Sequence, residues 1–405
     1  MLMKNNKYYP WMVVGLLWVV ALLNYLDRQM LSTMKPAIQQ SISELESATS
    51  FGRLMAIFLW IYGFMSPVSG MIADRINRKS LIVGSLFVWS AVTLLMGYAT
   101  TFNQLYWLRA VMGVSEALYI PAGLSLIADY HSTRSRSLAV GIHMTGLYTG
   151  QALGGFGATI AAAFSWQQTF HWFGIIGIVY SFVLILFLRE HRPDIKEERP
   201  PFFRGIKGVV TLLPFWIIFL YFSIPSIPGW AIKNWLPTLF AGSLNVPMGE
   251  AGPLATISTA VSCFIGVAIG GPLSDKWVQR NIRGRIYTSA IGLSLTIPAL
   301  LFLGLGHSPL FLVAASFCFG VGFGMFDANN MPILCQFVPS AKRATAYGIM
   351  NMGGVFSGAV ITDFLGKSTD AGHLGRDFAL MSLVILGAVA MLLLCLRPTT
   401  SDCKV

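Results

Sequence analysis

The sequence predicts an all-α membrane protein with twelve transmembrane helices arranged as two six-helix bundles. Of its 405 residues, 55% are hydrophobic and only 11% are charged, whereas a soluble domain usually carries about a quarter charged residues. The apolar residues gather into stretches of roughly 20 residues, which is the length that a helix needs to cross a bilayer. These stretches lie near residues 11–34, 51–73, 80–99, 103–128, 137–162, 167–188, 209–241, 251–275, 285–304, 309–333, 343–366 and 376–396.

The distribution of basic residues indicates the orientation of these helices. Twelve crossings place both termini on one side, and most of the 28 lysines and arginines then fall in the termini and loops of that side. Only Lys35, Arg53, Lys367 and Arg376 fall in loops on the other side. Because basic loops stay in the cytoplasm, we expect both termini to be cytoplasmic, in a bacterial inner membrane. This topology also accounts for the net charge of +11 without nucleic acid, which would require one basic stripe or patch.

A hydrophilic connector divides the chain into two halves. We predict an N-terminal six-helix bundle at 1–188, a cytoplasmic linker at 189–208 and a C-terminal six-helix bundle at 209–405. A weak internal repeat agrees with this division, because a Gly-x-x-x-Asp-basic pattern follows both the second and the eighth apolar stretch, at 70–79 and 271–276. Parallel repeats about an axis normal to the membrane produce such equivalent loops.

The repeated loops can act mechanically. Glycine allows two helices to approach closely, and an aspartate can accept hydrogen bonds from a helix N-terminus or an arginine. We therefore expect Asp74, Arg75, Arg78 and Asp275 to latch one conformation of the protein. The alternative is that the basic residues of these loops only fix the topology.

Charged residues also lie inside the apolar stretches, where they are costly unless they face one another or a wet cavity. Asp27 and Arg28 are adjacent in the first stretch, while Arg109 and Glu116 are seven residues apart in the fourth and therefore share a helical face. The pKa of a carboxyl group generally rises on burial and falls beside an arginine. We predict that Asp27 and Glu116 exchange protons, with Arg109 as the partner of Glu116. The alternative is a static ion pair.

Several motifs resemble known transporters. The repeated loop resembles the signature of the major facilitator superfamily. Three further segments resemble its anion:cation symporter family, which includes bacterial aldonate and hexuronate transporters and animal sialic acid and phosphate transporters. These segments are Asn24-Tyr25-x-Asp27-Arg28, Arg109-x-x-x-Gly113-x-x-Glu116-Ala117 and Asn234-Trp235-Leu236-Pro237-Thr238. The first two are also similar to the Spinster family of lysolipid and sphingolipid transporters, whereas the third favours organic anions.

This resemblance implies roles for individual residues. It implies that Tyr25, Arg28 and Tyr62 bind the anionic sugar, while Asp27 and Glu116 are protonated. A planar guanidinium such as that of Arg28 suits a carboxylate because it can donate two parallel hydrogen bonds.

Other polar residues in apolar stretches are weaker candidates. Tyr148, Gln151, Asn330 and Asn351 are predicted to bind substrate hydroxyls, although the two asparagines can equally join helices. Lys233 is either a second anion contact or a side chain that reaches the membrane surface. His143 is either a polar residue near the cytoplasmic end or a proton relay.

Asp327 has three possible roles: it pairs with Lys233, coordinates a coupling ion, or lies on a wet cavity wall. Pro225, Pro228 and Gly229 precede Lys233 and are expected to break or kink their helix.

Taken with the resemblance, these patterns predict a proton-coupled symporter of a small organic anion, most readily a hexuronate, aldonate or sialate, that works by alternating access. Coupling to sodium instead of protons is an alternative that the sequence leaves open. The alternatives are a Spinster-like carrier of lysolipid or another amphiphile, and a membrane sensor that does not transport. We expect a monomer with no cofactor and no metal site, and no enzyme, because the sequence holds no nucleophile-base set, metal-ligand cluster or phosphate-binding loop.

Overall fold

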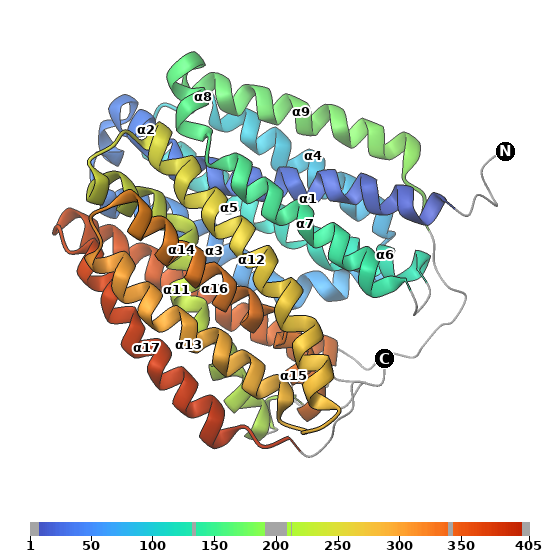
Figure 1. Cartoon of the computed structure of the whole chain (residues 1–405). Helices are drawn as coiled ribbons and strands as arrows, with labels where there is room; N and C mark the ends of the chain where they lie inside the picture. Colours follow the sequence, from blue (N-terminus) through green and yellow to red (C-terminus); the bar gives the residue numbers. More distant parts are fainter. Residues whose placement is uncertain (1–7, 132–134, 191–208, 212, 339–342, 399–405) are drawn as a thin grey trace.

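The computed structural model describes residues 8–131, 135–190, 209–211, 213–338 and 343–398, without the side chains at 74, 75, 136, 137, 213, 214 and 344. Within these residues the regular structure is entirely helical (Figure 1). The helices are α1 (Tyr9–Thr33), α2 (Lys35–Ser41), η1 (Ser43–Leu45), α3 (Ala48–Arg75), α4 (Arg78–Met96), α5 (Phe102–Ala117), α6 (Tyr119–Tyr130), α7 (Arg136–Gly154), α8 (Gly157–Phe164), α9 (Trp166–Phe187), α11 (Leu213–Leu244), α12 (Met248–Val278), α13 (Gly284–Leu305), α14 (Pro309–Asp327), α15 (Asn330–Phe337), α16 (Arg343–Asp370) and α17 (Leu374–Cys395).

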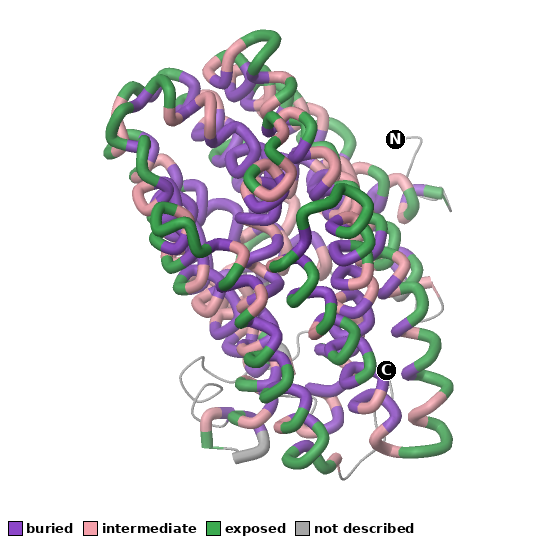
Figure 2. The backbone as a smooth tube through the Cα atoms, turned by 60° about the vertical axis from the view of Figure 1, so that its left-hand side comes forward, coloured by how far each residue is buried: buried purple, intermediate pink, exposed green. Residues whose placement is uncertain are grey.

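The helices form an elongated bundle with an apolar outer surface. Eleven helical segments of the described chain are long and apolar enough to cross a membrane. Large apolar side chains such as Val179 and Phe182 of α9 and Leu383 of α17 are more than half exposed, and Figure 2 shows the exposed residues along the outside of the bundle. Such a surface is suited to hydrocarbon and not to water. The predicted all-α membrane fold is therefore confirmed.

The predicted fifth crossing, at 137–162, is formed by two consecutive helices, α7 and α8. It is less apolar than the other crossings because it carries polar residues such as His143 and Gln151. A Cβ atom at Gly150 would collide with the backbone oxygen of Leu22. Glycine at this position therefore allows α7 to pack closely along α1, as small residues do in membrane helices.

Several helix pairs join the two halves of the chain. α3 packs along α16, α7 and α8 pack against α12, and α1 contacts α11. The predicted domain boundaries stay a prediction, because residues 191–208 of the proposed linker lie outside the described residues.

The bundle has two different ends, which we name by their helices. The terminal end is where α1 begins and α17 ends, and the far end is where α2 lies (Figure 1). At the far end, the carboxylate of Asp370 in α16 accepts hydrogen bonds from the backbone N–H groups of Ala48 and Thr49, at 2.7 and 2.8 Å, and from the Thr49 hydroxyl at 2.6 Å. The C-terminal half thus caps the first turn of α3 and closes the far end.

Helix breaks occur at positions that the sequence did not predict. α11 continues as one helix through Pro225, Pro228 and Pro237. The predicted break at this place is therefore wrong, whereas the alternative, a kink, stays a prediction. The crossings that do break are α5–α6, at Leu118, and α14–α15, at Ala328 and Asn329. An acidic residue lies in the last two positions of the helix before each break, Glu116 in α5 and Asp327 in α14. Each of these side chains therefore lies near the middle of its crossing.

We predict that Asp370→Ala opens the far end, because α3 loses a carboxylate cap worth about 1 kcal/mol. Spin labels at Glu46→Cys and His373→Cys, in a protein whose five cysteines are replaced by serine, should report a larger share of long distances. Asp363→Ala is the matched control, since Asp363 also faces α3 but only through an exposed contact with Arg53 at 3.8 Å, and such pairs contribute little. Equal distance distributions in the two variants would contradict this function of the cap.

Candidate functional site

A cavity of about 610 Å³ lies between the two halves. It extends from mid-depth, at Tyr25, Tyr62, Lys233 and Asp327, to the terminal end at Arg78. Most of its lining is apolar and comes from both halves: Met71, Ile120, Pro121, Leu124, Met144, Leu147, Phe222, Trp230, Phe323, Phe326, Met331 and Val355. Because the far end is closed, the cavity gives access to the middle of the bundle from the terminal end.

A cluster of charged side chains lies behind the N-terminal wall of this cavity. The Arg28 Nε donates to the Glu116 Oε2 at 2.5 Å, and this ion pair links α1 to α5. The Glu116 side chain is fully buried, and that of Arg28 is 11% exposed. Two charges removed from water in this way stabilise each other only while they stay paired, so the contact is sensitive to the protonation of Glu116.

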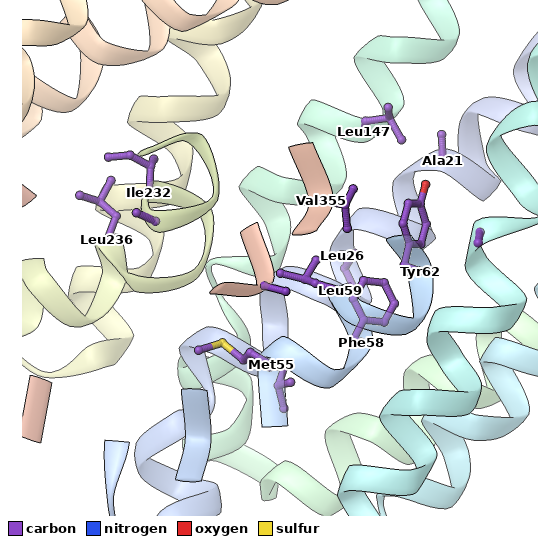
Figure 3. Close-up of a cluster of buried hydrophobic side chains, with 14 of the residues drawn as sticks. Ala21, Leu26, Met55, Phe58, Leu59, Tyr62, Leu147, Ile232, Leu236 and Val355 are labelled. Atoms are coloured by element: carbon purple, nitrogen blue, oxygen red, sulfur yellow. The ribbon is translucent and has the colours of Figure 1, made fainter. Parts of the chain in front are cut away.

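Aromatic rings surround the Arg28 guanidinium. The ring centres of Phe58, Tyr62 and Tyr25 lie 4.8, 4.8 and 5.1 Å from its central carbon, close enough for cation–π attraction. Figure 3 shows Phe58 and Tyr62 one turn apart on the same side of α3, with Leu26 of α1 beside them. Tyr25 and Tyr62 line the cavity whereas Arg28 does not. In this conformation the two tyrosines therefore separate the predicted anion-binding arginine from the cavity.

The other two predicted members of the cluster have different neighbours. Arg109 is not the direct partner of Glu116, as the helical spacing suggested, because Arg28 reaches Glu116 first. The Arg109 guanidinium instead lies 4.4 Å from the centre of the Phe58 ring, and its charge acts on Glu116 without a hydrogen bond. Asp27 is 5% exposed, and it accepts a hydrogen bond of 3.3 Å from the hydroxyl of Thr93 in α4. The structure thus brings all four predicted charges into one cluster with a different pairing.

The C-terminal wall carries a second set of polar side chains. Lys233 of α11 and Asp327 of α14 line both the main cavity and a small side pocket of about 40 Å³. Tyr148 and Gln151, which were predicted to bind hydroxyls, line only this side pocket. Lys233 therefore faces the cavity, and the alternative that it reaches the membrane surface does not describe this conformation.

The remaining predicted contacts bind protein groups in this conformation. Asn330 donates to Asp327 at 3.1 Å, and Asn351, although it lines the cavity, donates to the Ser66 hydroxyl of α3 at 2.7 Å. His143 is fully buried, and its Nε2 lies 2.8 Å from the Tyr119 hydroxyl. Asn351 thus joins two helices across the cavity, and His143 lies outside the cavity lining.

The structure describes the repeated pattern of the two loops only in part, so the latch stays a prediction. The side chains of Asp74 and Arg75 lie outside the described part. Arg78 forms an ion pair with Asp129 at the end of α6. In the second half Arg285 contacts Asp275 at 3.4 Å. Arginine–aspartate pairs thus join neighbouring helices at the terminal end of both halves.

Sequence reasoning missed three residues that shape this site. Phe58 lies against both Arg28 and Arg109, Trp230 lies against Lys233, and Asp129 pairs with Arg78. An aromatic residue in an apolar helix cannot be recognised as a site residue from the sequence, because aromatic residues occur in both lipid-facing and core positions. Asp129 carried a signal, since a carboxylate at the end of an apolar stretch requires a partner.

The chain is similar to known membrane transporters along most of its length. The Major Facilitator Superfamily model matches residues 17–362. The chain is 25% identical to a sphingosine-1-phosphate transporter of Xenopus tropicalis, over 96% of this chain and 83% of that one. It is 24% identical to the probable galactarate/D-glucarate transporter GarP of Escherichia coli K12, over 87% of this chain and 86% of that one.

A solved structure has the same fold. The crystal structure of a bacterial homologue of the human lysosomal transporter Spinster, in an inward-facing and unoccupied conformation, superposes with a TM-score of 0.80. That comparison covers 96% of this chain and 97% of the other at 20% identity.

We predict that Arg28→Met destabilises the protein by about 3–5 kcal/mol, because it leaves the carboxylate of Glu116 buried without a partner. Adding Glu116→Gln should restore part of that loss, since the double variant buries no unpaired charge. The measurement is the thermal unfolding of both single variants and the double variant in detergent. Arg53→Met removes an exposed pair and should change little. Additive losses in the double variant would show that the two side chains are not coupled.

Proposed function

Because the chain belongs to the Major Facilitator Superfamily, whose members are membrane transporters and not enzymes, we propose that it transports a small organic anion together with protons. The observation that carries this proposal is the buried Arg28–Glu116 pair, which lies one layer of tyrosine rings away from the cavity. A guanidinium that can bind either a protein carboxylate or a substrate carboxylate supplies a direct way to couple the two.

The coupling follows from charge balance. While Glu116 is ionised it holds Arg28, and the burial of this pair is favourable only because the two charges compensate each other. Protonation of Glu116 removes its charge and frees Arg28, which can then move between Tyr25 and Tyr62 to meet an anion in the cavity. When the anion leaves, Arg28 again requires a counter-charge, and Glu116 releases its proton to provide one.

Asp27 supports this cycle from the opposite side of the cluster. It is buried and accepts a hydrogen bond from Thr93. Its ionised form would also be close enough to interact with the charge of Glu116. Two carboxylates in one buried cluster favour the protonation of at least one of them. Asp27 is thus the second proton site of the proposed cycle.

Alternating access is the movement that completes the cycle. The cavity reaches the terminal end while the Asp370 cap closes the far end. With both termini in the cytoplasm of a bacterium, this arrangement is the inward-open state of the carrier. Substrate release then occurs into the cytoplasm, and opening the far end requires the α16–α3 cap to break.

A sugar acid is the first substrate candidate. The Asn234–Thr238 motif and the similarity to a probable galactarate/D-glucarate transporter support it. An amphiphilic anion such as a lysophospholipid is the second candidate, and one observation favours it: the cavity lining is largely apolar, and Asn330 and Asn351 already bond protein groups. The similarity to a sphingosine-1-phosphate transporter agrees with this second candidate.

We predict that Glu116→Gln abolishes uptake driven by a proton gradient but preserves exchange, because a permanently neutral side chain binds substrate without moving a proton. The measurement is uptake into proteoliposomes of radiolabelled D-glucarate and, in parallel, of radiolabelled lysophosphatidylglycerol, with and without an inward-directed proton gradient. Asp363→Asn, which changes a half-buried acid of α16 outside the cavity lining, is the control and should behave as wild type.

The outcomes separate the candidate functions. Gradient-driven uptake that survives in Glu116→Gln would remove Glu116 as a proton site. If the wild-type protein takes up the lysolipid and not D-glucarate, the substrate is an amphiphilic anion and not a sugar acid. Binding of either compound without any flux would favour the membrane sensor.

A further inference from the structure

The C-terminal half contains an acid–base arrangement equivalent to that of the N-terminal half. Arg28 lies on α1, the first crossing of its half, and Lys233 lies on α11, the first crossing of the second half. Glu116 lies just before the break between α5 and α6, and Asp327 lies just before the break between α14 and α15. Two repeats of one architecture thus place a cation and a carboxylate at corresponding positions.

The two arrangements differ in their exposure to the cavity. Arg28 and Glu116 are in direct contact behind the tyrosines, whereas Lys233 and Asp327 both line the cavity. No ion pair joins these two described side chains, although the charge of Lys233 acts on Asp327. The C-terminal arrangement is therefore the open counterpart of a closed pair.

The surroundings of Lys233 hold it in a position to receive an anion. Its ammonium group lies 4.8 Å from the centre of the Trp230 ring and 5.7 Å from that of Tyr25, so aromatic faces steady the cation without consuming its hydrogen-bond donors. The Arg28 guanidinium lies on the same Tyr25 ring. One tyrosine thus lies between the cations of the two halves.

Asp327 is unexpected in a cavity that receives anions. It is the only acidic residue among the described residues that line the cavity and its side pocket, and it is exposed to that space. Like charges repel strongly where little water screens them, so an isolated carboxylate here would exclude an anionic substrate. Its presence is favourable if it balances Lys233 while the cavity is empty.

We propose that Lys233 is the anion contact of the C-terminal half, and that Asp327 is its exchangeable counter-ion, displaced when the acidic group of the substrate binds. Asn330, which donates to Asp327 at 3.1 Å, holds the displaced carboxylate. This inference rests on the proposed function, because it requires an anionic cargo. It adds a second competitor for the substrate, in the C-terminal half, beside the competition of Glu116 for Arg28.

The two members of the pair have opposite effects on apparent affinity. Asp327→Asn removes the competitor and should lower KM by about fivefold, whereas Lys233→Gln removes the contact and should raise KM about tenfold. In the Lys233→Gln background, Asp327→Asn should no longer lower KM, since the competition requires the lysine. The probes are radiolabelled D-glucarate and lysophosphatidylglycerol, each in proteoliposomes, with Asp363→Asn as the charge-matched control.

Two results for KM would overturn the inference. If Asp327→Asn raises KM, as it would when the carboxylate accepts a hydrogen bond from a hydroxyl of the substrate, Asp327 is a contact and not a competitor. If it lowers KM equally in the presence and absence of Lys233, it acts only as a general negative charge in the cavity.

A second measurement tests the pair without any transport. Melting temperatures in detergent, without ligand, should fall in each single variant and recover in the double variant Lys233→Gln/Asp327→Asn, because a lone charge in the cavity is less favourable than none. Additive shifts would overturn the charge pair. If the shifts in melting temperature are coupled but the wild-type protein takes up neither probe, the Lys233–Asp327 pair is supported and the proposed function is contradicted.

Discussion

The need to compensate charges inside apolar helices governs this structure. Glu116 has no access to water, so it depends on Arg28, and this contact ties α1 to α5 at the depth where the cavity ends. Phe58, Tyr62 and Tyr25 then pack on the guanidinium and form the inner wall of the cavity. A change in the charge of one carboxylate would thus act on a helix contact, on an aromatic wall and on an anion-binding group together.

The two halves use the same plan for different purposes. Each half places a cation on its first crossing and a carboxylate at the break of its fourth, and each pairs an arginine with an aspartate at the terminal end. The N-terminal charges are enclosed and the C-terminal charges face the cavity. In the proposed cycle the N-terminal half therefore exchanges the protons, while each half supplies one cation for the cargo.

The cavity itself limits what the cargo can be. Its volume of about 610 Å³ lies within the range of small-molecule sites, and its apolar lining favours a cargo with some apolar surface. Lys233 and Asp327 lie at its closed inner end, near Tyr25. An anion with its acidic group at mid-depth and its body toward the terminal end fits both features, whether that body is a sugar chain or an acyl chain.

The sequence by itself determined the class of protein, the number of crossings and the residues that form the charge cluster, because hydrocarbon restricts length, apolarity and charge so strongly that local patterns suffice. It did not determine partners. Helical spacing paired Glu116 with Arg109 on its own helix, but a side chain from α1 lay closer once the helices packed. It also predicted a break or a kink at Pro225 and Pro228, whereas α11 is continuous there and the breaks occur near Glu116 and Asp327. Only the tertiary structure decided which cation faces the cavity, because that depends on contacts between helices far apart in the chain.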